Sequence, residues 1–392
     1  ENPTIDISRI KALAMESLES FHHSPVPEWV AGMVGGLSAA LLALVVVCNA
    51  ITAKPRKEEA GERNDYRTGL LLSLFGGQLH VAIMTSFALW FLLTLSVMLP
   101  FFWFSQPEEV KPKAGNITAS INFCEGPDFH HSEMLAEPVN VVTSVLFYLP
   151  VGLIGLLGPA CKEGKGELRF FFSYASIGLV GIGSGALHAS LDAVAQAGDE
   201  LPMLYAATML AYCCADIFLT KRGMRKASAI LPWITAFITL ANTIMYVGSR
   251  DDFGIFAATF ALYTSISVFY FSSYCLRWVS AISDETVEGP IRYQVIRPLS
   301  LGLGASLAIG GICWALEMGM CSDVINYQRF GDDWAPFVWR YMLHSLWHAG
   351  TAMAAMLMIQ NLIAVRAMQM GWGRPKIDWC GLPYVHFNVK TD

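Results

Sequence analysis

Nine stretches of about 20 mainly apolar residues set the main constraint on this chain, because each is long enough to cross the hydrocarbon core of a membrane as a helix. Only 15% of the 392 residues are charged, against about 25% in a typical soluble protein, and that is too few to cover a soluble globule of this size. The sequence therefore predicts an all-α polytopic membrane protein. The predicted spans are 29–53, 79–104, 138–158, 168–191, 201–220, 227–247, 253–274, 298–320 and 336–365.

The composition also disfavours several other classes of protein. A formal net charge of -6 at pH 7, with no large basic cluster, repels nucleic acid, so we expect no nucleic-acid partner. The 9 cysteines form no C-x-x-C pair, which argues against a zinc ribbon and against a small domain held together by disulfides. An integral membrane protein is the interpretation that the composition favours.

The predicted spans fall into two groups. A polar N-terminal segment is followed by a two-span addition, a lumenal loop with acidic residues, a seven-helix unit and a C-terminal tail. These five parts are residues 1–28, 29–104, 105–137, 138–365 and 366–392. An added pair of spans could anchor a partner, so any partners in a membrane complex are expected to bind through the N-terminal helices.

Lysine and arginine gather on alternate connections between the spans. The positive-inside rule then places the C-terminus on the cytosolic side and the N-terminus on the lumenal side. The endoplasmic reticulum or the Golgi is the expected location, and another organelle membrane, such as the mitochondrial inner membrane, stays open. The basic connections are 54–67, 162–169, 221–226, 277–297 and 366–376.

Two features of the predicted lumenal loops agree with this orientation. A glycosylation sequon begins at Asn116 in the loop before the third span. Cys124 lies in the same loop and Cys321 in another, so a disulfide can join them if their Cα atoms lie within about 7 Å. Two cysteines in two loops need not meet, and a random sequon falls on a given side about half the time, so both features stay open.

Three histidines lie in apolar spans, where ionisable side chains are costly, at about 2.5–3.5 kcal/mol for a charged residue at the helix centre. His344 and His348 are one turn apart on one helix face and can offer two imidazoles to one metal ion. Span 168–191 ends just past His188 on the side where span 336–365 begins, so all three are expected at a similar depth. Three neutral imidazoles leave a fourth position open, which is typical of a catalytic zinc site.

Asp199 and Ser184 are expected beside this site. Asp199, predicted to begin the helix that follows, can take a proton from water and return it to a leaving amine. Ser184 lies one turn before His188 and can donate a hydrogen bond to an oxyanion. Plainer explanations exist: a core histidine, acidic residues at a helix start before Pro202, and a serine in a glycine-rich packing run. The joint occurrence of these residues at one depth favours the metal centre.

Over about residues 122–365, these motifs resemble those of the alkaline ceramidases, a seven-helix family of membrane amidases. That family is part of a superfamily of transmembrane hydrolases that also includes adiponectin-receptor-like proteins. The pair of N-terminal spans is absent from its compact members. The matching residues are Gly183, Ser184, His188, the run Asp199-Glu200-Leu201-Pro202-Met203, the run His344-Ser345-Leu346-Trp347-His348, Cys124-Glu125, Ala136-Glu137, Asn140, Trp314, Glu317 and Cys321.

The resemblance implies that ceramide, a membrane lipid, is hydrolysed to a sphingoid base and a fatty acid. It implies zinc held by His188, His344 and His348, with Asp199 as the acid and base and Ser184 as the group that stabilises the oxyanion. Two alternatives remain. The first, suggested by the added spans, is a ceramidase-fold accessory subunit with reduced or no catalysis. The second is a receptor-like protein of the wider superfamily, and the motif that begins at Asp199 disfavours this second alternative.

The resemblance also implies a calcium site just before the first core helix. Glu125 and Glu137 stand at its acidic positions. Asn122 stands where an aspartate is usual and Pro127 where an asparagine is usual, and the two glutamates are one residue further apart than in the family. Asp128 could take the place of a missing ligand.

Overall fold

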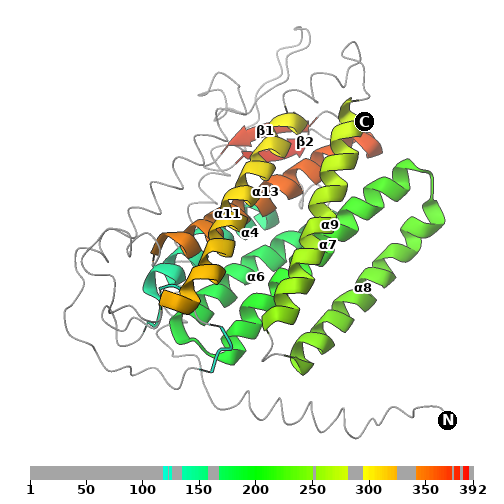
Figure 1. Ribbon diagram of the computed structural model, residues 1–392. Coiled ribbons are helices and arrows are strands. Elements are labelled where there is room, and N and C mark those ends of the chain that lie inside the picture. Colours follow the sequence, from blue (N-terminus) through cyan, green and yellow to red (C-terminus); the bar gives the residue numbers. More distant parts are fainter. Residues whose placement is uncertain are drawn as a thin grey trace, which may run out of the picture.

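The computed structural model describes residues 118–121, 123–125, 135–157, 167–249, 253–280, 295–324, 341–372, 375–379 and 383–387. These residues form seven helices and a two-stranded sheet (Figure 1). The predicted spans 29–53 and 79–104 lie outside the described residues, as do Asn116, Asn122 and Asp128. The elements are α4 (Pro138–Leu157), α6 (Leu168–Ser190), α7 (Ala193–Lys221), α8 (Arg225–Gly248), α9 (Phe253–Ser280), α11 (Arg297–Val324), α13 (Leu343–Met370), β1 (Pro375–Trp379) and β2 (Pro383–Phe387).

The prediction of an all-α polytopic membrane protein is confirmed. Within the described part of the chain, six helices are long and apolar enough to cross a membrane, and α9 begins with a further apolar stretch from Phe253 to Ser267. Helix α8 lies at the edge of the bundle and packs on α7 (Figure 1). Its Trp233 and Phe237 side chains are 78% and 71% exposed, which suits a face covered by lipid acyl chains.

Helix α13 is the centre of the bundle. It packs against α11, α4, α7 and α6, and nearly every side chain from Ala352 to Ala367 is buried. An apolar helix is stable either inside a bundle or against lipid, and the burial of α13 places it inside the bundle. This central position fixes the direction in which the N-terminal turns of α13, with His344 and His348, point.

Several helix boundaries differ from the predicted spans, among them the start of α7 and the end of α13. Helix α7 begins at Ala193, because the Asp192 carboxylate accepts a hydrogen bond of 2.8 Å from the Val194 N–H and caps the helix. The prediction that Asp199 begins this helix is therefore wrong: Asp199 lies in its second turn. Helix α13 extends to Met370, five residues past the predicted end of its span.

A short hairpin follows α13 within the segment predicted as a polar tail. Strands β1 and β2 pair antiparallel, and Tyr384 and Val385 are buried in the main core of the bundle. The Val385 N–H donates to the Gln360 side-chain carbonyl on α13. The hairpin is thus packed on the end of the bundle that is opposite the histidines.

An ion-pair network joins the helices at this same end. Arg169 at the start of α6 contacts Asp216 of α7 at 2.5 Å and Glu167 at 2.7 Å. Arg366 of α13 contacts Glu167 at 2.8 Å and Asp216 at 3.4 Å. Removing one partner would leave a buried charge unpaired, which is costly. The network therefore fixes the positions of α6, α7 and α13 relative to one another.

Helices α6 and α7 approach each other most closely at Gly183 and Gly198. A Cβ atom at position 183 would lie 1.9 Å from the Gly198 carbonyl oxygen and 2.6 Å from the Asp199 nitrogen. Both are backbone atoms, so no side-chain rotation can relieve the overlap. The glycine at 183 therefore sets the distance between Ser184 on one helix and Asp199 on the other.

We expect Gly183→Ala to destabilise the fold by about 1–3 kcal/mol, because the two helix backbones must separate. Thermal unfolding in detergent should show a lower Tm. The control is Gly304→Ala on α11, where an added Cβ meets nothing within 4 Å and the Tm should stay the same or rise. An unchanged Tm for Gly183→Ala would contradict the close approach.

Candidate metal centre

The structure brings His188, His344 and His348 together. His188 comes from the last turn of α6, and the other two come from the first turns of α13. The side chains are 0–3% exposed, and one ligand nitrogen from each lies within 4.8 Å of the others. The Nε2 atoms of His188 and His344 are 3.1 Å apart. Two nitrogens bound at about 2.0–2.1 Å to one tetrahedral zinc lie about 3.3 Å apart, so this spacing fits such an ion.

The other ring nitrogen of each histidine has a polar partner. Nδ1 of His188 contacts the Glu137 carboxylate at 2.5 Å, and Nδ1 of His344 contacts the Glu317 carboxylate at 2.6 Å. Nδ1 of His348 lies 3.0 Å from the Thr143 hydroxyl, whose own proton goes to a backbone carbonyl.

These contacts favour the tautomer in which each Nδ1 carries the hydrogen. The Nε2 lone pairs are then free for a metal, and the rings are fixed in orientation. A carboxylate that accepts from a metal-bound histidine also raises the basicity of the ligand.

Glu137 and Glu317 contact the histidines, and sequence reasoning missed both contacts. From the sequence, Glu137 is expected only in the calcium site and Glu317 only in a family motif. For Glu317 a signal was present, because a carboxylate within an apolar span needs a partner. In the structure it is fully buried and also accepts a hydrogen bond of 3.1 Å from the Cys124 N–H. For Glu137 the contact with His188 spans 51 residues and depends on packing.

Ser184 and Asp199 lie in the same chamber as His344 and His348. The Ser184 hydroxyl is 2.9 Å from that of Ser144, and it also forms a side-chain hydrogen bond with Asp199. Oδ1 of Asp199 is buried and has no hydrogen-bond partner within the described part of the chain. An orphaned carboxylate oxygen beside three imidazoles is a free acceptor for a proton or a water molecule.

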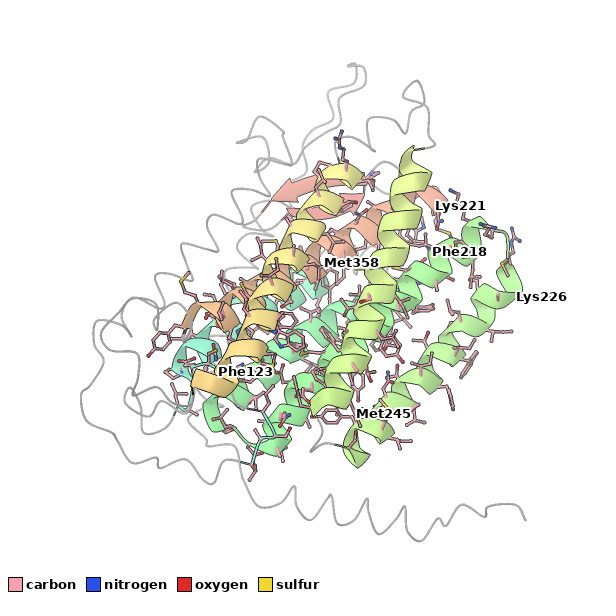
Figure 2. All side chains as sticks on the ribbon, in the orientation of Figure 1. Phe123, Phe218, Lys221, Lys226, Met245 and Met358 are labelled. Atoms are coloured by element: carbon pink, nitrogen blue, oxygen red, sulfur yellow. The ribbon has the colours of Figure 1, made fainter. Side chains whose placement is uncertain are left out.

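An apolar cavity of about 590 Å³ adjoins this chamber. The two share five lining residues, and none of the described residues that line the larger cavity is charged. Its walls come mainly from α7, α9, α11 and α13. Figure 2 labels Phe123, next to the histidine rings, and Met358, on the cavity wall nearer the bundle centre. The shared residues are Tyr148, Met203, Phe260, Trp314 and Trp347.

The acidic residues predicted for calcium lie at the start of α4. Both carboxylate oxygens of Glu125 accept backbone hydrogen bonds of 2.8 Å, from Val139 and Asn140, so this side chain caps the helix. Glu137 contacts His188, as described above, and the Asn140 side-chain amide donates to it at 3.2 Å. The structure thus places Glu125 and Glu137 around one helix terminus, next to the histidines.

Cys124 is disulfide-bonded. The side chain of Cys321 lies outside the described residues, so the pairing of these two cysteines stays a prediction. Cys213 and Cys313 carry free thiols.

We expect Glu317→Gln to weaken zinc binding about 10- to 100-fold, because the His344 ring loses the carboxylate that orients it. Competition with a zinc chelator measures this affinity in purified protein. The matched control is Asp192→Asn, which removes a carboxylate whose capping role asparagine also fills, and should leave the zinc affinity unchanged. Equal affinities for Glu317→Gln and the unmodified protein would contradict the orienting role.

Comparisons with known proteins agree with this geometry. Residues 115–386 match the family model described as Ceramidase. Alkaline ceramidase YPC1 of Saccharomyces cerevisiae is 28% identical over 287 residues, which are 69% of this chain and 84% of that protein. Alkaline ceramidase of Arabidopsis thaliana is 24% identical over 273 residues, 69% of this chain and 93% of that protein. Alkaline ceramidase 3 of Mus musculus is 22% identical over 265 residues, 68% and 90% respectively. The family match spans well over half of the chain and includes all three histidines, and we conclude that the chain belongs to the ceramidase family.

Proposed function

We propose that this protein is a zinc-dependent intramembrane amidase that hydrolyses ceramide, or a related N-acyl sphingoid lipid, to a sphingoid base and a fatty acid. The observation that carries the proposal is the buried group of His188, His344 and His348 beside Asp199, at the mouth of an apolar cavity. The relatives named alkaline ceramidases support the choice of substrate.

The donor set suits zinc. All three candidate ligands are imidazoles, each with its Nδ1 engaged by an outer partner, and three imidazoles with one open position make the usual catalytic arrangement. A zinc ion held by these nitrogens would supply Lewis-acid chemistry, which polarises a carbonyl and lowers the pKa of water to about 7.

The chain's own residues then have separate tasks. As the water oxygen attacks the amide carbon, Asp199 accepts the proton that the water loses, and it delivers this proton to the nitrogen when the C–N bond breaks. Ser184 donates a hydrogen bond to the carbonyl oxygen as negative charge builds there. The uncharged cavity holds an acyl chain and keeps bulk water from the buried chamber.

We also propose that calcium binds at the start of α4. Oε1 of Glu137 and Oδ1 of Asn140 are buried there without a hydrogen-bond partner among the described residues, and oxygen atoms of this kind are calcium ligands. Since Glu137 also contacts His188, bound calcium would stiffen a zinc ligand. We expect calcium to raise the Tm of the unmodified protein and to leave the Tm of Glu137→Gln unchanged; an equal rise in both would contradict this site.

Purified full-length protein, reconstituted with ceramide in mixed micelles, tests the proposed reaction. Mass spectrometry should detect a fatty acid and a sphingoid base in equal amounts, formed by zinc-loaded protein and not after zinc is removed. Zinc-loaded, folded protein that releases neither product would contradict the amidase proposal and would support the alternative of an accessory subunit.

A further inference from the structure

Glu200 is a buried carboxylate in the chamber that the proposed reaction does not use. It is 3% exposed and lines the chamber together with Asp199, His344 and His348. Apart from Asp199, it is the only acidic residue among the described residues that line this chamber.

Partners from two helices hold this carboxylate in place. Nε2 of Gln196, one turn earlier on α7, donates to Oε1 of Glu200 at 2.9 Å, and Tyr246 of α8 also forms a side-chain hydrogen bond with Glu200. Gln196 is in turn fixed by Ser120, whose N–H donates to it at 2.8 Å. All of these partners are neutral, and among the described residues no lysine, arginine or histidine forms an ion pair with Glu200. A buried carboxylate without a cation is costly, which suggests that a ligand supplies the missing positive or hydrogen-bonding group.

The chamber around Glu200 and the adjoining cavity are lined by different kinds of residue. Phe253, Phe256 and Phe260 of α9 line the chamber near Glu200, and Tyr246 packs on Phe256 with ring centroids 6.4 Å apart. Aromatic faces next to a carboxylate favour an organic cation. Among the described residues, none that lines the adjoining larger cavity is charged, so this cavity suits a hydrocarbon chain.

The proposed reaction yields two products with opposite charges. Hydrolysis of the amide gives a fatty acid, which ionises to an anion, and an amine, which takes up a proton to become an ammonium cation. A fixed carboxylate attracts the ammonium and repels the fatty-acid anion. In the substrate, the same carboxylate can accept hydrogen bonds from the hydroxyls on the two carbons next to the carbon that bears the amide nitrogen.

We propose that Glu200 binds the polar end of the sphingoid part of the lipid: it accepts hydrogen bonds from the hydroxyls of the substrate and pairs with the ammonium of the released base. This inference rests on the proposed amidase function and adds to it the orientation of the bound lipid. The acyl chain lies in the apolar cavity, and the hydroxylated end lies beneath the aromatic residues of α9.

Steady-state kinetics of full-length Glu200→Gln test this role. We expect the KM for ceramide to rise about tenfold, since a charge-assisted hydrogen bond is lost, while kcat stays within about threefold. For an N-acyl alkylamine that lacks both hydroxyls, the KM should be the same in the variant and the unmodified enzyme. Inhibition by sphingosine or by a plain long-chain alkylamine should weaken about tenfold.

Two controls separate this role from a structural one. Zinc content and Tm should match those of the unmodified protein, and Glu200→Asp, which keeps the charge, should retain most of the inhibition by alkylamine. Unchanged KM and amine inhibition in Glu200→Gln, with an active unmodified enzyme, would overturn the role of Glu200. An unmodified enzyme that is zinc-loaded but inactive would overturn the proposed function instead.

If Glu200→Gln does not fold, the unmodified enzyme supports an equivalent test. The KM for the N-acyl alkylamine should then be about tenfold above that for ceramide, and an alkylamine should inhibit about tenfold more strongly than a fatty alcohol of equal length. Equal values in both comparisons would overturn the proposal.

Discussion

Replacing His188 with alanine is expected to remove bound zinc and to lower the rate of fatty-acid release by more than about 1,000-fold. Of the three histidines it is the only one supplied by α6, so its loss leaves only the pair on α13. Two ligands bind zinc far more weakly than three, and the lost Lewis acid is worth several kcal/mol, where about 1.4 kcal/mol is a tenfold change in rate. Elemental analysis of purified protein gives the zinc content, and release of fatty acid from ceramide gives the rate.

His386→Ala is the matched control. This histidine is in β2, opposite Lys376 of β1, in the hairpin at the other end of the bundle. The His386→Ala protein should retain both zinc and activity. One zinc per chain in purified His188→Ala protein would contradict the assignment of this residue as a ligand.

The second large effect is expected for Asp199→Asn, which should lower kcat by about 100- to 10,000-fold while zinc stays bound. An asparagine keeps the shape of the side chain and its hydrogen bond to Ser184, but it cannot accept the proton of the attacking water. Asp199 is not one of the three residues whose ligand atoms converge, so the metal should be unaffected. Single-turnover hydrolysis and zinc analysis of the same preparation measure the two quantities.

Asp192→Asn provides the comparison on the same helix. Asp192 caps α7 through the Val194 N–H, and asparagine is also a good N-cap, so both stability and kcat should change little. A full kcat in Asp199→Asn would rule out the proton-transfer role, and loss of zinc would show that Asp199 is itself a ligand.

The helical spans and the histidine group could be predicted from the sequence, because both follow from simple periodicities. Apolar stretches of sufficient length predict spans, and the four-residue spacing of His344 and His348 places both on one face of a helix. The alternating directions of successive spans place His188 at the same depth in the membrane as the other two histidines. Ser184 lies one turn before His188, and Asp199 is expected at the same depth as the histidines; the family motifs agree with both. In the structure both residues line the chamber.

Features that depend on tertiary packing could not be predicted in this way. The segment before Asp199 is rich in alanine and contains a glutamine, so hydropathy gave no sign that α7 starts at Ala193. Glu137 contacts His188, and Glu317 contacts both Cys124 and His344. Each of these contacts joins segments that are far apart in the chain. The C-terminal hairpin is held by burial of Tyr384 and Val385 rather than by a strong local signal.

Zinc K-edge X-ray absorption on the purified full-length protein tests the central claim most directly. We expect one zinc per chain, bound by three imidazole nitrogens at about 2.0–2.1 Å and by one oxygen ligand. In His344→Ala protein this signal should be lost. A spectrum with sulfur ligands, or protein that hydrolyses ceramide at full rate with no zinc bound, would contradict the account.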